Sequence, residues 1–543
     1  MSADEKKSDV QLQDEQRLNQ LGYKQELHRS LSSFANFGIA FTILSVPTAL
    51  LPLIYLGMTT GGPASLLISW PIIAVLSFLV GLSISEIVSA YPTSGGLYYW
   101  AANLAGPKRA PIFSYFTGWF NFLGLWGITS GTAFGFGQIF ATYLYTNGSW
   151  NTTDIPTTDM RYKGVVVASS AVSLLIVALL GKASSRTLNY FAQGCLGINI
   201  VGLLVMGFGT AFMGNVPRTP LPTLITTWVN TTGFSDAWAA FVGILPAALT
   251  YSGYDSAAHL AEETVGAARA GPKAILISMA VTLPVGFLMG WSLLAPVPID
   301  QYSSFANSPV STSTVIDIFF LVGGNAGGLI MTTTLFIVFV TGVYSMAITH
   351  SRMTYAFARD GGLPGSKFLY VLDAASETPV RALWITLFLD FIIIIPSLYS
   401  SALYAAINSV GTIGTYLCYA IPIFLRIVRD KEFPRGPFNL GRFGLPVAVV
   451  AFIWLLIACV ALSLPTVNVV SSNFSDYSSF IAAYLSSFNW APVMVVGIFL
   501  IALIIWVVSA RHWFKGPKLD IKTIEAFSRR NRGSASSATL TSL

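Results

Sequence analysis

Long apolar stretches alternate with short polar ones along almost the whole chain. Between Arg29 and Glu86 no residue is charged, and residues 57–63 (GMTTGGP) form a turn that divides this stretch into two parts. Each part is long enough to cross a membrane, since a spanning helix needs about 20 mainly apolar residues. The pattern predicts twelve spans: 32–56, 64–90, 111–145, 164–181, 190–213, 237–262, 273–295, 326–349, 381–397, 402–427, 445–465 and 491–511.

Composition points to the same class of protein. Of the 543 residues, 54% are hydrophobic and only 10% are charged, against about 25% charged in ordinary globular proteins. So much apolar surface cannot be hidden in a water-soluble core, and we predict an all-α membrane protein that crosses the bilayer many times. The polar tails, residues 1–31 and 512–543, are expected to be disordered.

Basic residues are unevenly shared between the two sides of this arrangement. Twelve spans place both termini on one side, and of the 30 Lys and Arg residues all but Arg161, Lys163 and Arg218 fall there. The positive-inside rule then makes both tails cytoplasmic. Four sequons for N-glycosylation fall in loops on the opposite side: Asn147, Asn151, Asn230 and Asn473. The two signals agree, and the plasma membrane is favoured over a vacuolar membrane.

Two spans contain residues that interrupt a helix. Pro47 in the first span removes a backbone donor, and in the sixth span Pro246 and Gly253 precede the carboxylate of Asp255. Even mild insertion scales assign a mid-membrane Asp a cost of about 2.5–3.5 kcal/mol. Either span alone could simply be kinked, but interruptions in the first spans of two five-span halves indicate the binding site of an inverted-repeat transporter.

The expected breaks also indicate a class of ligand. Half-helix N-termini carry free N–H groups and a partial positive charge, which suit a carboxylate. Free carbonyl groups at the other half-helix ends suit an ammonium group. A site made from two broken helices therefore favours a zwitterion such as an amino acid.

Three motifs carry a resemblance to a known family. They are residues 91–100 (YPTSGGLYYW), 253–263 (GYDSAAHLAEE) followed by 271–275, and 351–364 (SRMTYAFARDGGLP) followed by 378–381. With these motifs in order, the chain resembles the amino acid–polyamine–organocation permeases, in the branch of fungal and plant GABA, choline and bidirectional amino acid permeases. The resemblance implies twelve transmembrane helices in a five-plus-five inverted repeat with broken helices 1 and 6. The repeats would be residues 32–213 and 237–427, with two extra helices in 445–511.

The same resemblance implies roles for individual residues. Backbone amides of an unwound segment near residues 42–48, with Ser45, would hold the substrate carboxylate, and carbonyls of residues 250–255 would hold the amino group. Tyr251 would be an aromatic gate, and Asp255 matches a position linked to protons or to substrate charge. The candidate substrate-binding residues are Thr42, Ser45, Val46, Thr48, Thr250, Tyr251, Ser252, Gly253, Tyr254 and Asp255.

Coupling and gating candidates are Asp255, His259, Glu262, Glu263, Asn199, Thr341 and Ser345. Some proton-coupled relatives carry a lysine in the fifth span, which this chain lacks, and Thr341 with Ser345 could instead face a sodium ion. His259 follows Asp255 by four residues, on the same helical face, and could relay protons or pair with Glu262 or Glu263. These two glutamates could close an inner gate by pairing with Arg269 or Arg352.

Other kinds of chemistry find no support in the sequence. It has no phosphate-binding glycine motif, no metal-ligand spacing and no nucleophile elbow, so neither an enzyme, a cofactor, a metal nor a nucleic-acid partner is expected. We expect secondary active transport of amino acids in the bilayer, with GABA-like substrates and H⁺ coupling favoured. A choline permease is the alternative, with an aromatic cage from Tyr251, Tyr254, Trp119 and Trp126. A non-transporting nutrient sensor is a minor alternative.

Overall fold

The computed structural model describes residues 3–146, 159–306, 313–398, 403–469 and 477–517. Within these ranges the regular structure is helical, with two isolated bridges and no β-strand. Nine of the described helical segments are long and apolar enough to cross a membrane. An all-α membrane protein is confirmed. The twelve-span count stays a prediction, because the expected spans 111–145, 237–262 and 381–397 correspond to helices outside those nine.

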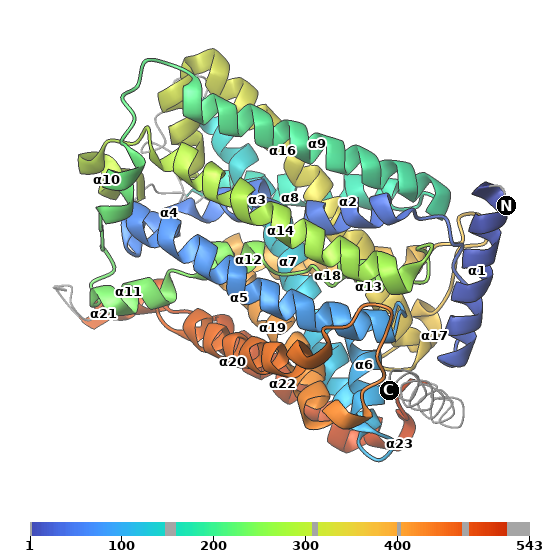
Figure 1. Cartoon of the computed structure of the whole chain (residues 1–543). Coiled ribbons are helices and arrows are strands. Elements are labelled where there is room, and N and C mark those ends of the chain that lie inside the picture. Colours follow the sequence, from blue (N-terminus) through green and yellow to red (C-terminus); the bar gives the residue numbers. More distant parts are fainter. Residues whose placement is uncertain (1–2, 147–158, 307–312, 399–402, 470–476, 518–543) are drawn as a thin grey trace, which may run out of the picture.

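Most long helices run along one common direction, and α1 (Ala3–Gln20) lies across one end of the bundle (Figure 1). The first half contains α2 Ser33–Ile43, α3 Val46–Ala49, α4 Ile54–Thr59, α5 Gly62–Ala90, α6 Gly96–Ala105, α7 Ala110–Thr146, α8 Met160–Leu180 and α9 Ser185–Phe212. The second half contains α11 Asp236–Val242, α12 Leu245–Thr250, α13 Ser256–His259, α14 Ala267–Leu294, α16 Ser313–Arg359, α18 Val380–Ile394 and α19 Leu403–Val428. The remaining helices are α10 Leu221–Thr226, α15 Tyr302–Ala306, α17 Ser366–Leu369, α20 Gly444–Ser463, α21 Tyr477–Ser487, α22 Ala491–Ile505 and α23 Arg511–Trp513.

Glycines let α7 and α19 approach each other closely. A Cβ atom on Gly127 would lie 2.5 Å from the backbone nitrogen of Gly411, and one on Gly414 would lie 2.8 Å from the nitrogen of Gly124. Small residues at such positions are how helices pack closely within a bilayer. The contact brings polar side chains of α7 and α19 to the sixth-span break.

Large apolar side chains cover the outward faces of the bundle. Ile72 on α5, Phe208 on α9 and Ile504 on α22 are all exposed. Water would make these faces costly, whereas lipid chains are as apolar as the side chains themselves. The fold therefore presents a surface suited to a bilayer.

In the described part of residues 1–31, where disorder was expected, the structure has a helix and buried side chains. Residues 3–20 form α1, and the side chains of Leu18 and Tyr23 are buried. The hydroxyl of Tyr99 donates to the carbonyl of Leu21 at 2.7 Å. The segment is highly charged as a whole, but a few of its side chains are apolar and pack against the folded bundle. In the other expected tail, residues 518–543 lie outside the described residues.

The expected eighth span, 326–349, is part of a longer helix. Helix α16 runs from Ser313 to Arg359, with a kink at Gly324, where φ is 56°. Residues 351–359, which lie beyond the end of the expected span, are helical. No proline or glycine interrupts the chain between residue 343 and Gly361, so polarity alone does not end the helix.

Three of the expected glycosylation sites, Asn147, Asn151 and Asn473, lie outside the described residues. Asn230 is described and half-buried. Its Nδ2 donates to the carbonyl of Phe234 and to Asp236 Oδ1, both at 2.9 Å. Glycosylation would use this same nitrogen, so modification of Asn230 competes with the loop's own hydrogen bonds, and it stays a prediction.

Candidate functional site

The first span is broken between α2 and α3. Ser45 connects them with extended backbone, φ −63° and ψ 110°. Pro47 lies in the first turn of α3, where the missing N–H costs little. The break is narrower than the expected 42–48, since only Leu44 and Ser45 leave the helices. One extended residue is enough to expose N–H groups at the start of the outer half-helix.

The sixth span is broken where the sequence predicts it. Helix α12 ends at Thr250, α13 begins at Ser256, and residues 251–255 lie between them. Gly253 has φ +81°, a conformation that L side chains rarely adopt. A Cβ on Gly253 would also lie 2.7 Å from Cγ2 of Ile43, the last residue of α2. The two breaks are therefore in contact.

Several candidate hydroxyls bond back to their own segments. The pairs are Thr42 to Gly38 O at 2.7 Å, Thr48 to Ser45 O at 3.3 Å, Thr250 to Pro246 O at 2.7 Å and Ser252 to Leu249 O at 2.6 Å. Such bonds are the usual state of hydroxyls in membrane helices. Tyr251 differs, because its buried hydroxyl has no partner among the described residues while its ring contacts Trp70 at 5.7 Å.

Asp255 is buried, and other side chains bond both of its oxygens. The hydroxyl of Tyr419, from α19, donates to Oδ1 at 2.5 Å and accepts the N–H of Gly253 at 3.1 Å. Nε2 of His259 lies 3.0 Å from Oδ2. The carboxylate thus joins the sixth-span break to α19. The ring of Tyr254, which belongs to the same segment, packs against the ring of Tyr419 in a tilted arrangement, with 4.9 Å between centroids.

His259 contacts polar groups through both of its ring nitrogens. Nδ1 lies 3.1 Å from the carbonyl of Ser94. Nε2 faces Oδ2 of Asp255 at 3.0 Å and, at 3.1 Å, Nδ2 of Asn121 on α7. The imidazole thus links the sixth-span break to α7.

Ser45, Asn199 and Thr341 also come together. Ser45 Oγ donates to Asn199 Oδ1 at 2.9 Å, and Asn199 Nδ2 donates to Thr341 Oγ1 at 2.9 Å. The amide orientation follows from its third bond, because Nδ2 donates to the carbonyl of Cys195 at 3.0 Å. The hydrogen of the Ser45 hydroxyl is thus engaged by the fifth span. Ser345, a further candidate, is buried with no partner for Oγ in the described structure.

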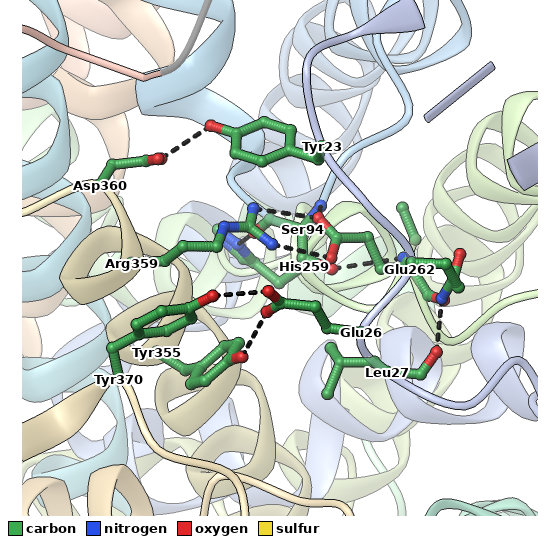
Figure 2. Close-up of polar contacts among 12 residues, drawn as sticks. Tyr23, Glu26, Leu27, Ser94, His259, Glu262, Tyr355, Arg359, Asp360 and Tyr370 are labelled. Atoms are coloured by element: carbon green, nitrogen blue, oxygen red, sulfur yellow. Dashed lines mark hydrogen bonds and ion pairs between the residues drawn. The ribbon is translucent and has the colours of Figure 1, made fainter. Parts of the chain in front are cut away.

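An ion pair closes the end of the bundle that α1 covers. Arg359, at the end of α16, makes two parallel hydrogen bonds to Glu262, at 3.0 and 3.2 Å (Figure 2). The backbone N–H of Ser94 donates to the same carboxylate at 3.1 Å. Glu263 pairs with Arg352 at 2.8 Å. The sequence analysis expected Arg269 or Arg352 as partners of the two glutamates. Arg352 pairs with Glu263 in the structure, whereas the side chain of Arg269 is exposed.

The N-terminal segment lies over this ion pair. Tyr355 and Tyr370 donate to the carboxylate of Glu26, at 2.7 and 2.5 Å (Figure 2). The guanidinium of Arg359 lies 4.0 Å from the ring centroid of Tyr23, whose hydroxyl donates to Asp360 at 2.8 Å. Burial raises the pKa of the Asp360 carboxyl, and Arg359 opposes that effect. This end is sealed by paired charges and by the chain's own N-terminus.

The opposite end of the bundle contains a cavity of about 340 Å³. Its walls come from the outer half of the first span, the start of the sixth, and the neighbouring parts of α19, α20 and α21; they include Tyr55, Thr59, Val242, Ser409 and Asn489. Hydroxyl and amide groups alternate there with aliphatic side chains. The cavity and the Arg359–Glu262 ion pair therefore lie at opposite ends of the bundle.

The sequence analysis missed two partners of the central residues. Tyr419 lies 164 positions from Asp255, and nothing in its sequence context marks it. Arg359 belongs to the third motif, residues 351–364. Its partner Glu262 lies 97 positions away, so the distance along the sequence does not indicate the pair. The buried Asp255 itself was the available signal, because a buried carboxylate needs donors from other elements.

Substituting Gly253 by Ala should impair the site. A side chain at φ +81° strains the backbone, and its Cβ would overlap Ile43, so we expect a loss of about 1–3 kcal/mol in stability and a matching fall in transport. Thermal unfolding of the purified protein and uptake in cells measure both effects. Gly497→Ala, at a site with open space, is the matched control. Wild-type behaviour of Gly253→Ala would mean that the break tolerates a side chain.

Comparison with known proteins identifies similar chains. A family model described as amino acid permease matches residues 31–488. Over 526 residues the chain is 35% identical to the amino-acid permease BAT1 of Arabidopsis thaliana, covering 93% of this chain and 96% of that protein. A BAT1 homolog of Oryza sativa subsp. japonica is 34% identical, covering 92% and 95%. An uncharacterized amino-acid permease of Schizosaccharomyces pombe is 28% identical, covering 93% and 85%.

Proposed function

Because the chain belongs to the amino acid permease family, we propose that it is a secondary active carrier that moves zwitterionic amino acids, GABA-like ones above all, together with protons. The observation that carries this proposal is the contact between two broken helices beside a buried Asp–His pair. N–H groups after Ser45 would face the substrate carboxylate, and carbonyls of residues 250–255 would face its ammonium group.

Proton coupling is supported over sodium coupling by the surroundings of Thr341. A sodium ion needs several oxygen atoms with free lone pairs. Here the Nδ2 donor of Asn199 points at Thr341 Oγ1, and the hydroxyl donates onward to the carbonyl of Val338. A donor amide at that position disfavours a bound cation, whereas the carboxylate of Asp255 and the imidazole of His259 lie 3.0 Å apart at the sixth-span break.

The membrane orientation is part of the proposal. The end closed by Glu262 and Arg359 would face the cytoplasm, as the distribution of basic residues predicts. The 340 Å³ cavity would then open toward the outside of the cell or, in a vacuolar membrane, toward the lumen. Substrate would enter from that side, and the ion pair would separate to release it.

Choline remains the second candidate, through the four aromatic residues proposed for a cage. In the structure Tyr251 contacts Trp70 and Tyr254 contacts Tyr419, while Trp119 and Trp126 both contact Phe122. The four rings are thus divided among three separate aromatic groups. Uptake decides between the candidates.

The test is uptake of labelled GABA, choline and other amino acids in cells that lack their own permeases, at two pH values, with and without sodium. We expect saturable GABA uptake that is faster at low pH, indifferent to sodium and inhibited by other zwitterions. Choline uptake that amino acids do not inhibit would replace the proposed substrate. A surface-localised protein with no uptake at all would favour the sensor alternative.

Ser45→Ala separates the two substrate classes. Removing the hydroxyl leaves Asn199 Oδ1 buried without its donor, and one lost hydrogen bond of this kind costs about 1–3 kcal/mol. We expect the KM for GABA to rise at least about fivefold, whereas a quaternary ammonium has no carboxylate to sense the change. Thr42→Ala is the control, because that hydroxyl bonds only to its own helix. Equal effects of the two variants would contradict a role for Ser45 in the site.

A further inference from the structure

A second buried acid–base pair lies outside the substrate site. Asp390 on α18 and His350 on α16 are both fully buried, and His350 Nδ1 lies 4.0 Å from Asp390 Oδ2. Ser130 on α7 donates to Asp390 Oδ1 at 3.0 Å. The sequence analysis expects a span at 381–397 without marking a partner for Asp390. His350 lies 40 positions away, and only the packing of α16 against α18 brings it near.

The pair is incompletely satisfied by the protein. Oδ2 of Asp390 and both ring nitrogens of His350 have no hydrogen-bond partner among the described residues. A separation of 4.0 Å is too long for a hydrogen bond. Buried polar atoms without partners are costly to the folded state. A structural role would be met by shorter, closed contacts, so the geometry fits a site that gains and loses a small ligand.

The surroundings contain few other charges. Helix α7 carries no charged residue, and Arg161 and Lys163 of α8 lie in its first turn, remote from Asp390 along the helices. On α16 itself Arg352 is paired with Glu263. Asp390 therefore has His350 as its nearby base, and the natural ligand of such a pair is a proton.

Proton counting shows what the pair holds. A protonated Asp390 beside a neutral His350 carries the same number of protons as an ionised Asp390 beside an imidazolium. In both arrangements one proton is bound and the pair is neutral overall. Releasing it leaves a bare carboxylate, and adding a second leaves an imidazolium without a counter-ion. Burial disfavours both charged states.

The pair is connected to the Asp255 site through α7. Adjacent residues of that helix reach the two imidazoles: Asn121 bonds His259, and the ring of Phe122 contacts His350 edge-on at 4.9 Å. The two imidazoles therefore contact neighbouring residues of one helix.

We propose that Asp390 and His350 form a second proton-binding site, carried by α16 and α18, that exchanges its proton during transport separately from Asp255 and His259. The proposal rests on the proposed proton-driven transport. The sixth span would move relative to α16 when the bundle opens. This movement would change how Asn121 and Phe122 of α7 contact the two histidines, and so link proton occupancy to the state of the carrier.

Infrared difference spectroscopy tests the site without a substrate. Full-length protein in lipid vesicles is recorded between two pH values, in the region of the carboxylic acid C=O stretch. We expect a band that titrates in the wild type, disappears in Asp390→Asn and changes its midpoint in His350→Gln. Glu377→Gln, an exposed carboxyl variant, should leave the band unchanged. Titrating bands that are identical in the wild type and in Asp390→Asn would overturn the proposal.

Two further measurements complete the test. If Asp390→Asn does not fold, Ser130→Ala retains both titrating groups and should still shift the midpoint, and an unshifted midpoint would overturn the proposal. Labelled GABA in the same vesicles should show that Asp390→Asn loses proton-driven accumulation but keeps exchange across the membrane. Wild-type vesicles that take up no GABA would refute the proposed function, while the infrared titration would still decide the proton site.

Discussion

Asp255→Asn is expected to lower amino acid uptake at least tenfold while leaving the amount of protein at the membrane unchanged. A tenfold change is about the effect of losing one hydrogen bond to a charged group. An asparagine has the shape of the aspartate, and its oxygen can still accept from Tyr419 while its amide faces His259. Folding should survive for this reason. The amide cannot take up or release a proton, so any part that Asp255 plays in the proposed proton coupling is lost.

Uptake of labelled substrate measures this effect, and surface labelling shows how much protein is present. Tyr419→Phe is the matched comparison, because it removes one bond to Asp255 while keeping the carboxyl group. We expect it to retain pH-dependent uptake at a lower rate. Normal uptake by a well-folded Asp255→Asn protein would remove Asp255 from the site.

Arg359→Ala should have the second large effect, on stability. The substitution leaves Glu262 buried without its bidentate partner, and removing one member of a buried pair costs about 3–5 kcal/mol. It also takes the cation from the ring of Tyr23. We expect a lower unfolding temperature in detergent and little protein at the membrane.

The double variant Glu262→Gln with Arg359→Gln tests whether the unpaired buried charge causes the loss of stability. Neutralising both partners removes that charge, so the double variant should be more stable than Arg359→Ala. Arg442→Ala, at an exposed position, controls for the loss of one positive charge and should behave like the wild type. If Arg359→Ala is as stable as Arg442→Ala, the ion pair does not hold this end closed.

Much of the fold was predictable because its signals are local. Apolar stretches of membrane length, the Pro47 and Pro246 positions, and Gly253 act through backbone geometry and hydrophobicity, which depend on neighbouring residues. The spacing of Asp255 and His259 likewise places both on one helical face, and the structure has them in contact. The helices at residues 3–20 and 351–359 were not predicted, because neither segment shows the apolar pattern of a span.

By itself the sequence determined a polytopic all-α protein with two interrupted helices and a carboxylate at one of them. Tertiary structure decided which distant groups surround that carboxylate, which arginine pairs with Glu262, and that His350 lies beside Asp390. The reason is physical. A helix break or an apolar span follows from its own residues, whereas the partner of a buried charge is set by how the helices cross. Here glycine contacts hold α7 and α19 together, and these helices bring Asn121 to His259 and Tyr419 to Asp255.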